Sequence, residues 1–350
     1  MSFFCPKSRT RSLAALLVLG LLFTCFPASA QEKNPASPIM VPNPAADLWR
    51  AVRQRDAPAV GQTQVGGVET GMLISSSGED FRNFRRQDLI SKSAMFIGGF
   101  AALILIFYVT RGCIRIPGGR SGRKIRRFPD FDRTLHWFIA ILFLFQALTG
   151  MILLFGRFVV LPVFGPEAFG VIASACLEGH NLFGPLFLVA LFLLFIRFAA
   201  KNIPKRRDLT WLRRGGGAIG EGHVSSGFFN AGEKIWFWAV IVLGLTVSIS
   251  GLILDFPILG QGRETMQLTL IVHGITAVLL TAGSLAHIYI GTIGSEGSLE
   301  SMTTGYVDEN WAEAHHDLWY AEVMQHGEPV VDQKEGKQET PPMNASPDKA

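Results

Sequence analysis

The sequence predicts an all-α membrane protein, built as a four-helix transmembrane bundle with one extra N-terminal transmembrane helix. Charged residues make up only 17% of the 350 residues, whereas a typical soluble chain has about 25%. The mean hydropathy is +0.30, and the apolar residues gather in long blocks between basic, glycine-rich stretches. These features exclude a disordered chain, a coiled coil and a disulfide-dense miniprotein. The net charge of +4 is too small to indicate nucleic acid as a partner.

The N-terminus has the three parts of a secretory signal peptide. Three basic residues precede an apolar core at 13–26, and Ala28-Ser29-Ala30 supplies a cleavage site before Gln31. The basic residues are Lys7, Arg9 and Arg11. We therefore predict a signal peptide over 1–30, with an uncleaved signal anchor as the alternative. Cleavage removes three basic residues and no acid, which leaves the mature chain at +1.

The cysteines limit the metal chemistry that the chain can carry. Cys5 and Cys25 leave with the signal peptide, so Cys113 and Cys176 remain. An iron–sulfur cluster usually needs four thiolates. The sequence also lacks a C-x-x-C-H motif, which excludes covalently attached c-type haem. Any metal chemistry therefore depends on histidine.

Five apolar blocks follow a polar segment. Each block is about long enough to cross a hydrocarbon core of ~30 Å as a helix, and helices satisfy their own backbone groups in lipid. The blocks are 93–110, 136–155, 181–199, 235–254 and 268–290. They divide the chain into a periplasmic segment at 31–92, the extra helix at 93–110, a basic loop at 111–133, the four-helix domain at 134–293 and a tail at 294–350.

The loops between these blocks predict the orientation. The loop 111–133 contains eight lysines and arginines and the loop 200–234 contains seven, whereas 156–180 and 255–267 contain one each. Loops rich in Lys and Arg stay in the cytoplasm. The two basic loops and the tail are therefore predicted to be cytoplasmic, and residues 31–92 periplasmic, in a bacterial inner membrane.

Four of the eight histidines lie in or beside the apolar blocks, where an ionisable residue is costly and usually functional. His273 and His287 are 14 residues apart, which places them on one helix face and about 21 Å apart along the axis. His180 lies at the depth of His273, and His136 lies at the depth of His287. The pairs His180/His273 and His136/His287 are therefore predicted to hold the iron of two haem b groups. Arg133 and Arg197 are candidates for the haem propionates.

Simpler interpretations compete with haem. A histidine at a helix end can be an interfacial polar residue, and two histidines on one face can form hydrogen bonds between helices. The remaining histidines, 223, 315, 316 and 326, are predicted to face solvent. A weak internal repeat relates 147–155 to 248–256, as ALTGMILLF and SISGLILDF. It suggests related roles for the second and fourth spans, with chance similarity of apolar helices as the alternative.

Residues 130–295 resemble the gamma, cytochrome b subunit of membrane-bound formate dehydrogenase. The matching stretches are FDRTLHWFIAILFLFQALTGMILLFG, HNLFGPLFLVALFLLFIRF, FNAGEKIWFW and VHGITAVLLTAGSLAHIYIGTI. They contain all four histidines in order. The family pattern has four helices, so the signal peptide, the external segment and the first span are additions, which we expect to contact partner subunits.

The resemblance implies an oxidoreductase subunit that does not itself oxidise formate. It implies two haems b that take electrons from an iron–sulfur beta subunit, fed by a periplasmic alpha subunit containing molybdenum or tungsten. A quinone, menaquinone or ubiquinone, would be reduced near the cytoplasmic face. The quinone-site residues of the family match Asn230 and Gly232, and His287 also lines that site. Glu233 and Lys234 are predicted as charged anchors at the helix end, with proton relay as the alternative.

Three alternatives remain open. The chain could be the cytochrome b subunit of a nickel–iron hydrogenase or a related quinone-reactive complex, because the histidine pattern alone does not separate these. It could be a haem-free membrane anchor for a periplasmic complex. It could also be a transporter with intramembrane histidines, although broken helices and larger repeats, which are typical of transporters, are not evident.

Overall fold

The computed structural model describes residues 76–217, 224–258, 260–326, 330–332 and 338–339. The predicted signal peptide at 1–30 and the histidine at 223 lie outside these residues. Within them, five helices are long and apolar enough to cross a membrane. They are α4 (Ile90–Arg111), α5 (Asp130–Val159), α6 (Leu161–Phe198), α8 (Ala231–Asp255) and α9 (Arg263–Tyr289). This confirms the predicted all-α, multi-pass membrane fold.

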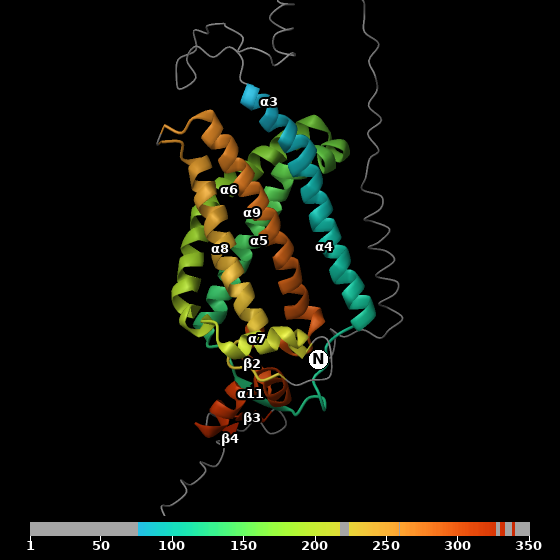
Figure 1. Cartoon of the computed structure of the whole chain (residues 1–350), viewed down its shortest axis with the longest axis vertical. Helices are drawn as coiled ribbons and strands as arrows, with labels where there is room; N and C mark the ends of the chain where they lie inside the picture. The colour runs from blue at the N-terminus through green and yellow to red at the C-terminus, as the bar shows by residue number, and fades with distance from the viewer. Residues whose placement is uncertain (1–75, 218–223, 259, 327–329, 333–337, 340–350) are drawn as a thin grey trace, which may run out of the picture.

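The four helices α5, α6, α8 and α9 form the bundle, and α4 lies beside it (Figure 1). Large apolar side chains point outward from the bundle, such as Ile141 and Leu148, which are both 64% exposed. Others fill the space between α5, α6 and α8, where Leu142, Phe187 and Leu191 are buried together. An apolar exterior around a packed interior is expected for helices whose solvent is lipid.

The extra helix begins earlier than the sequence predicts. A helix α3 (Ser76–Asn83) continues through a π-helical turn η1 (Phe84–Leu89) directly into α4. The end of the predicted periplasmic segment at 31–92 is therefore helical from Ser76 onward. The arginines and acids of this stretch lower its hydropathy. Hydropathy indicates which residues suit lipid and not which residues form a helix, so it did not predict this start.

The third span is also longer than predicted. The sequence places it at 181–199, but α6 runs from Leu161 to Phe198. Gly165 has φ 79° and ψ 172°, which makes a kink, and the helix resumes at Pro166. Proline is tolerated in the first turn of a helix because its missing N–H has no helical partner there. The prolines, glycines and acids of 156–180 lower the hydropathy, but most of this stretch is helical on either side of the kink at Gly165.

A folded cap covers one end of the bundle, which we call the cap end (Figure 1). An antiparallel sheet of order β2-β1-β3-β4 joins the loop after α4 to the C-terminal tail, with Ile125 paired with Val307. Its strands are β1 (Arg123–Arg126), β2 (Tyr306–Asp308), β3 (Val330–Asp332) and β4 (Gln338–Glu339). The helical elements at this end are η2 (Ala200–Asn202), α7 (Arg206–Arg213), η3 (Gly215–Gly217), η4 (Ile290–Gly294), α10 (Ser298–Thr303) and α11 (Glu309–Gln325).

Ion pairs tie the basic loop to the tail across the cap. Arg120 lies 2.6 Å from Glu300, and Arg123 lies 3.2 Å from Glu309. The cap also has its own apolar core, in which Ile125 and Val307 are fully buried. The basic loop and the tail, predicted as separate cytoplasmic segments, are therefore two halves of one folded unit at the same end of the bundle.

Candidate functional site

The four intramembrane histidines form two close pairs inside the bundle. Near the cap end, His136 of α5 and His287 of α9 have ring centroids 6.2 Å apart. Toward the opposite end, which we call the far end, His180 of α6 and His273 of α9 have ring centroids 6.1 Å apart. The chain thus brings together both pairs that the sequence predicts. The assignment of iron to them stays a prediction.

Hydrogen bonds orient both rings of the far pair. The Thr149 hydroxyl oxygen lies 2.8 Å from His180 Nδ1 and 2.8 Å from the carbonyl of Phe145. The carbonyl of Val247 lies 2.9 Å from His273 Nδ1, and a carbonyl can only accept. His273 therefore carries its proton on Nδ1. In both histidines Nδ1 is engaged by a hydrogen-bond partner, which leaves Nε2 as the nitrogen able to bind a metal.

Glycines give these two rings their space. A Cβ atom at Gly150 would lie 3.2 Å from Cε1 of His180, and one at Gly251 would lie 3.2 Å from Cε1 of His273. Both contacts are closer than ordinary van der Waals contact. The weak sequence repeat now has a structural meaning, because Thr149-Gly150 and Ser250-Gly251 make the same approach to the histidine of the following helix. The Ser250 hydroxyl lies 3.2 Å from His273 Nδ1.

The cap-end pair is held by packing. The indole of Trp236 stacks on His287 with centroids 5.2 Å apart and planes 19° apart. Gly283 makes room for this indole, because a Cβ there would lie 2.7 Å from Trp236 Cζ3. Nδ1 of His136 is buried and, within the described part of the chain, has no hydrogen-bond partner. A buried polar nitrogen without a partner is costly unless another group satisfies it.

The two residues matched to a quinone site lie at the start of α8. Asn230 caps this helix: its Oδ1 accepts from the backbone N–H of Glu233 at 2.9 Å, and Glu233 accepts from the backbone N–H of Asn230 at 2.9 Å. This capping box occupies the amide oxygen of Asn230. The two Nδ2 donors of Asn230 take no part in it. Gly232 packs under Trp211 of α7, where a Cβ would lie 3.1 Å from the indole.

The charges beside Asn230 are paired. Arg127 of the cap lies 3.0 Å from Glu233 and is surrounded by aromatic rings, among them Trp311 with its centroid 4.9 Å from the guanidinium carbon. Lys234 lies 2.7 Å from Asp208, and the side chains of both residues are largely buried. These contacts fit the predicted role of Glu233 and Lys234 as anchors at the helix end.

The prediction that the tail histidines face solvent is wrong for His316. This residue is 1% exposed, its Nδ1 lies 2.8 Å from the carbonyl of Gly227, and its Nε2 lies 3.8 Å from Glu233. Burial, followed by the charge of Arg127, lowers the pKa of His316 to about 3. His315 is half-buried against Trp311, whereas His326 is exposed. The cap buries His316 because α11 packs onto the loop before α8, which hydropathy does not predict.

Two arginines proposed for haem propionates have protein partners instead. Arg197 donates to both carboxylate oxygens of buried Asp132, at 2.6 and 3.0 Å. Arg133 donates to the carbonyl of Thr304 at 2.6 Å and lies 3.3 Å from Asp130. These contacts join α5 to α6 and to the cap. Because both guanidinium groups already have these partners, other residues are better candidates to bind haem propionates.

The donor sets suit a macrocycle better than a bare ion. Among the described residues, no group of three or more His, Cys, Asp or Glu side chains lies together as a metal site. Structural zinc needs four protein ligands, whereas haem brings its own nitrogens and needs only axial ones. Two imidazoles on opposite sides of one ion, with metal–nitrogen bonds of about 2 Å, have centroids about 6 Å apart. The separations of both pairs fit that arrangement.

Sequence reasoning missed several residues that shape these sites. They are Thr149, Ser250, Trp236, Trp211 and Arg127. The repeat of a hydroxyl residue followed by glycine could have indicated the first two. The others depend on which helices meet, and no sequence spacing reports that.

Comparison with known proteins gives consistent matches. A family model described as prokaryotic cytochrome b561 matches residues 127–305. The cytochrome b556(Fdn) subunit of the nitrate-inducible formate dehydrogenase of Escherichia coli K12 is 30% identical over 209 residues, 58% of this chain and 93% of that protein. The b556(fdo) subunit of the same organism is 27% identical, over 57% of this chain and 93% of its own length. A Haemophilus influenzae cytochrome b556 subunit of formate dehydrogenase is 28% identical, over 57% and 84%.

Proposed function

Because this chain belongs to the prokaryotic cytochrome b561 family, we propose that it is the di-haem cytochrome b membrane subunit of a formate dehydrogenase. Relatives named as cytochrome b556 subunits of formate dehydrogenase match it over most of their own length. The observation that carries the proposal is the presence of two histidine pairs inside one bundle, with centroids 6.1 and 6.2 Å apart. Formate oxidation itself belongs to another subunit of the complex.

His180 and His273 would hold one haem b, and His136 and His287 the other. Haem supplies reversible transfer of one electron at a time. The chain's own residues prepare the sites: Thr149 and the carbonyl of Val247 form hydrogen bonds with Nδ1 of the far pair, which leaves Nε2 available. Trp236 holds the ring plane of His287.

The direction of transfer follows from the predicted orientation. The basic loops and the tail meet in the cap. By the positive-inside rule, the cap end would lie in the cytoplasm and the far end in the periplasm. Electrons from formate oxidation would then move from the far end to the cap end. Each charge moved across the membrane field corresponds to about 2.3 kcal/mol per 100 mV, so transfer in this direction would generate membrane potential.

A quinone, menaquinone or ubiquinone, is the proposed electron acceptor near the cap end. Asn230 supports this because its side-chain oxygen is occupied by the helix cap while its Nδ2 donors, among the described residues, have no acceptor. An amide N–H of this kind suits a quinone carbonyl. Gly232 has no side chain, so the indole of Trp211 can pack closely against the start of α8. Protons for quinone reduction would enter from the cytoplasm.

The partners proposed are an iron–sulfur beta subunit and an alpha subunit containing molybdenum or tungsten, both on the periplasmic side. The matches to formate dehydrogenase subunits support them. The same matches favour formate dehydrogenase over a nickel–iron hydrogenase, which the histidine pattern alone does not separate.

The deciding experiment is an optical difference spectrum of the purified complex. We expect a b-type spectrum of two haems per chain when dithionite reduces the complex, and the same spectrum when formate does. Reduction by hydrogen gas and not by formate would assign the chain to a hydrogenase. A properly assembled complex without any b-type signal would show a haem-free anchor and refute the proposal.

A further inference from the structure

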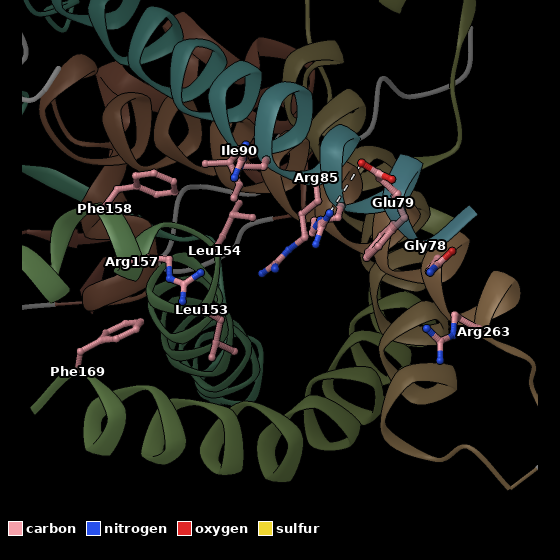
Figure 2. Close-up of a pocket in the computed structure, with 14 residues that line it drawn as sticks. Gly78, Glu79, Arg85, Ile90, Leu153, Leu154, Arg157, Phe158, Phe169 and Arg263 are labelled. Atoms are coloured by element: carbon pink, nitrogen blue, oxygen red, sulfur yellow. Dashed lines mark ion pairs between the residues drawn. The ribbon is translucent and has the colours of Figure 1, made fainter. Parts of the chain in front are cut away.

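A pocket of about 860 Å³ opens at the far end, between the extra helix and the bundle. Five arginines line it, together with a single acid. They are Arg82, Arg85, Arg86, Arg157 and Arg263, with Glu79. Figure 2 shows Arg85, from the extra helix, and Arg157, from α5, both directed toward the middle of this space. We call it the arginine pocket.

Three of the five arginines, Arg85, Arg86 and Arg157, bring positive charge to the pocket without an ion pair to any described residue. All three are exposed. Arg82 makes only a long contact of 3.9 Å with Glu79. Several unpaired guanidinium groups in one concave site raise the local positive potential and favour an anion, because each can bind a carboxylate through two parallel hydrogen bonds.

The pocket begins about one helical turn from the far histidine pair. Leu153 and Leu154, which line it, follow Gly150, and Gly150 contacts His180. On the other wall, Leu89 packs against Gly274, the neighbour of His273, and Arg85 lies one turn before Leu89. At 1.5 Å per residue, the backbones of Arg85 and Arg157 are about 6 to 10 Å farther out than this pair. Arginine side chains are long enough to shorten that distance.

We propose that the arginine pocket binds the propionate carboxylates of the haem held by His180 and His273, with Arg85 and Arg157 as their main partners. This inference rests on the proposed function. It assigns a role to the extra helix, which lies outside the family match at 127–305. The two arginines suggested by the sequence, Arg133 and Arg197, are bound to protein acids instead.

The test is a potentiometric titration of the purified complex, followed by visible spectroscopy. Arg85→Gln and Arg157→Gln each remove a positive charge that favours the reduced state, so we expect the midpoint potential of one haem to fall and the other to stay unchanged. The double variant should show a larger fall or selective loss of that one haem. Arg85→Lys keeps the charge and should restore most of the potential.

Lys92→Gln is the matched control. It removes a positive charge from the same helix, but Lys92 is 75% exposed and pairs with Asp88 at 2.7 Å, so both potentials should stay at the wild-type values. Unchanged potentials in a double variant that retains two haems would overturn the inference. So would unchanged potentials with loss of bound phospholipid, measured as phosphorus per complex, because the anion would then be a lipid headgroup. Absence of b-type haem from the wild-type complex would instead refute the proposed function.

Discussion

Atoms from a neighbouring helix contact Nδ1 of His180 and Nδ1 of His273. His180 Nδ1 lies against a hydroxyl that already donates to a carbonyl, and His273 Nδ1 lies against a carbonyl. The carbonyl places the ring proton of His273 on Nδ1, and the hydroxyl holds the ring of His180 in its orientation. A metal-binding histidine needs this kind of partner to fix its orientation. The residues that prepare the site are therefore Thr149 and Val247 as much as the histidines.

The two histidine pairs should be separable by mutation. We expect His287→Ala to remove one haem and, with it, formate-dependent quinone reduction, because His287 lies beside the proposed quinone site. His180→Ala should remove the other haem. In both variants the dithionite-reduced signal should fall to about half, since each site loses one of two axial ligands.

The exposed His326 provides the control, and His326→Ala should keep the full signal. Retention of two haems in His287→Ala would contradict the pairing of His136 with His287. Loss of both haems and of the complex in every variant would point to a purely structural role, so subunit assembly is measured in parallel by gel filtration.

His316 gives the cap a pH-dependent stability. Burial and the charge of Arg127 lower its folded-state pKa to about 3, below the ordinary value of about 6.5. Above pH 6.5 the residue is neutral in both states and its contribution is complete. As the pH falls from 6.5 toward 3, the unfolded chain binds a proton that the folded chain does not, and stability is lost at up to about 1.4 kcal/mol per pH unit.

Thermal unfolding of the detergent-purified complex between pH 4 and pH 8 measures this effect. His316→Gln should flatten the fall in unfolding temperature below pH 6.5, at the cost of a lower temperature at pH 8, where the bond to Gly227 is weakened. His326→Gln, at an exposed position, should follow the wild type. An unchanged acid slope in His316→Gln would show that other groups control it.

At the scale of elements, two pairs of helices pack against each other in the same way. α5 approaches α6 at Gly150, and α8 approaches α9 at Gly251, each with a hydroxyl residue just before the glycine. The internal repeat in the sequence thus corresponds to two equivalent helix contacts around one histidine pair. At the matching positions at the starts of α5 and α8, Asp132 pairs with Arg197 and Glu233 pairs with Arg127.

Filling either glycine should disturb the same site. We expect Gly150→Val and Gly251→Val each to lower the content of the haem held by His180 and His273 and to leave the other haem in place. A Cβ at either position already lies 3.2 Å from an imidazole carbon, so the added methyl groups must displace the ring. Overpacking of this kind costs about 1–3 kcal/mol.

Gly99→Val is the matched control, because a Cβ at Gly99 has nothing within 4 Å in the described chain. It should retain both haems, as counted from the dithionite-reduced spectrum per mole of chain. Normal spectra in both Gly150→Val and Gly251→Val would show that the close approach is not needed for the site.

At the scale of the whole molecule, one end of the bundle is folded over by the cap and the other holds the arginine pocket (Figures 1 and 2). The cap unites the loop after α4 with the tail through a sheet and ion pairs, so both must lie on one side of the membrane. This arrangement separates the proposed quinone end from the proposed electron-entry end. Two histidine pairs about 21 Å apart along α9 lie between them.

Reporter fusions test the orientation of the molecule. A reporter active only in the cytoplasm, fused after His326, should be active, and a reporter active only in the periplasm should be active when inserted at Gly260, between α8 and α9. Exchanging the two reporters provides the control, and both should then be silent. The opposite pattern would reverse the proposed direction of electron transfer.

The sequence by itself determined the membrane class, the number of spans and the pairing of the four histidines by depth. These follow from hydropathy and from the fixed rise of a helix, which are properties of the chain alone. It misplaced the starts of the extra helix and of α6, because helix formation continues through residues that do not suit lipid. It also predicted that the tail histidines face solvent, whereas His316 is buried.

Only the tertiary structure decided the hydrogen-bond partners of His180 and His273, the burial of His316, the partners of Arg197 and the arginine pocket. Each depends on side chains from elements far apart in the sequence, such as Thr149 with His180 and Arg85 with Arg157. Helical periodicity determines which face of a helix a residue occupies. Packing between helices determines which side chains contact that face. These contacts determine the hydrogen bonds, the charges and the space of the candidate sites.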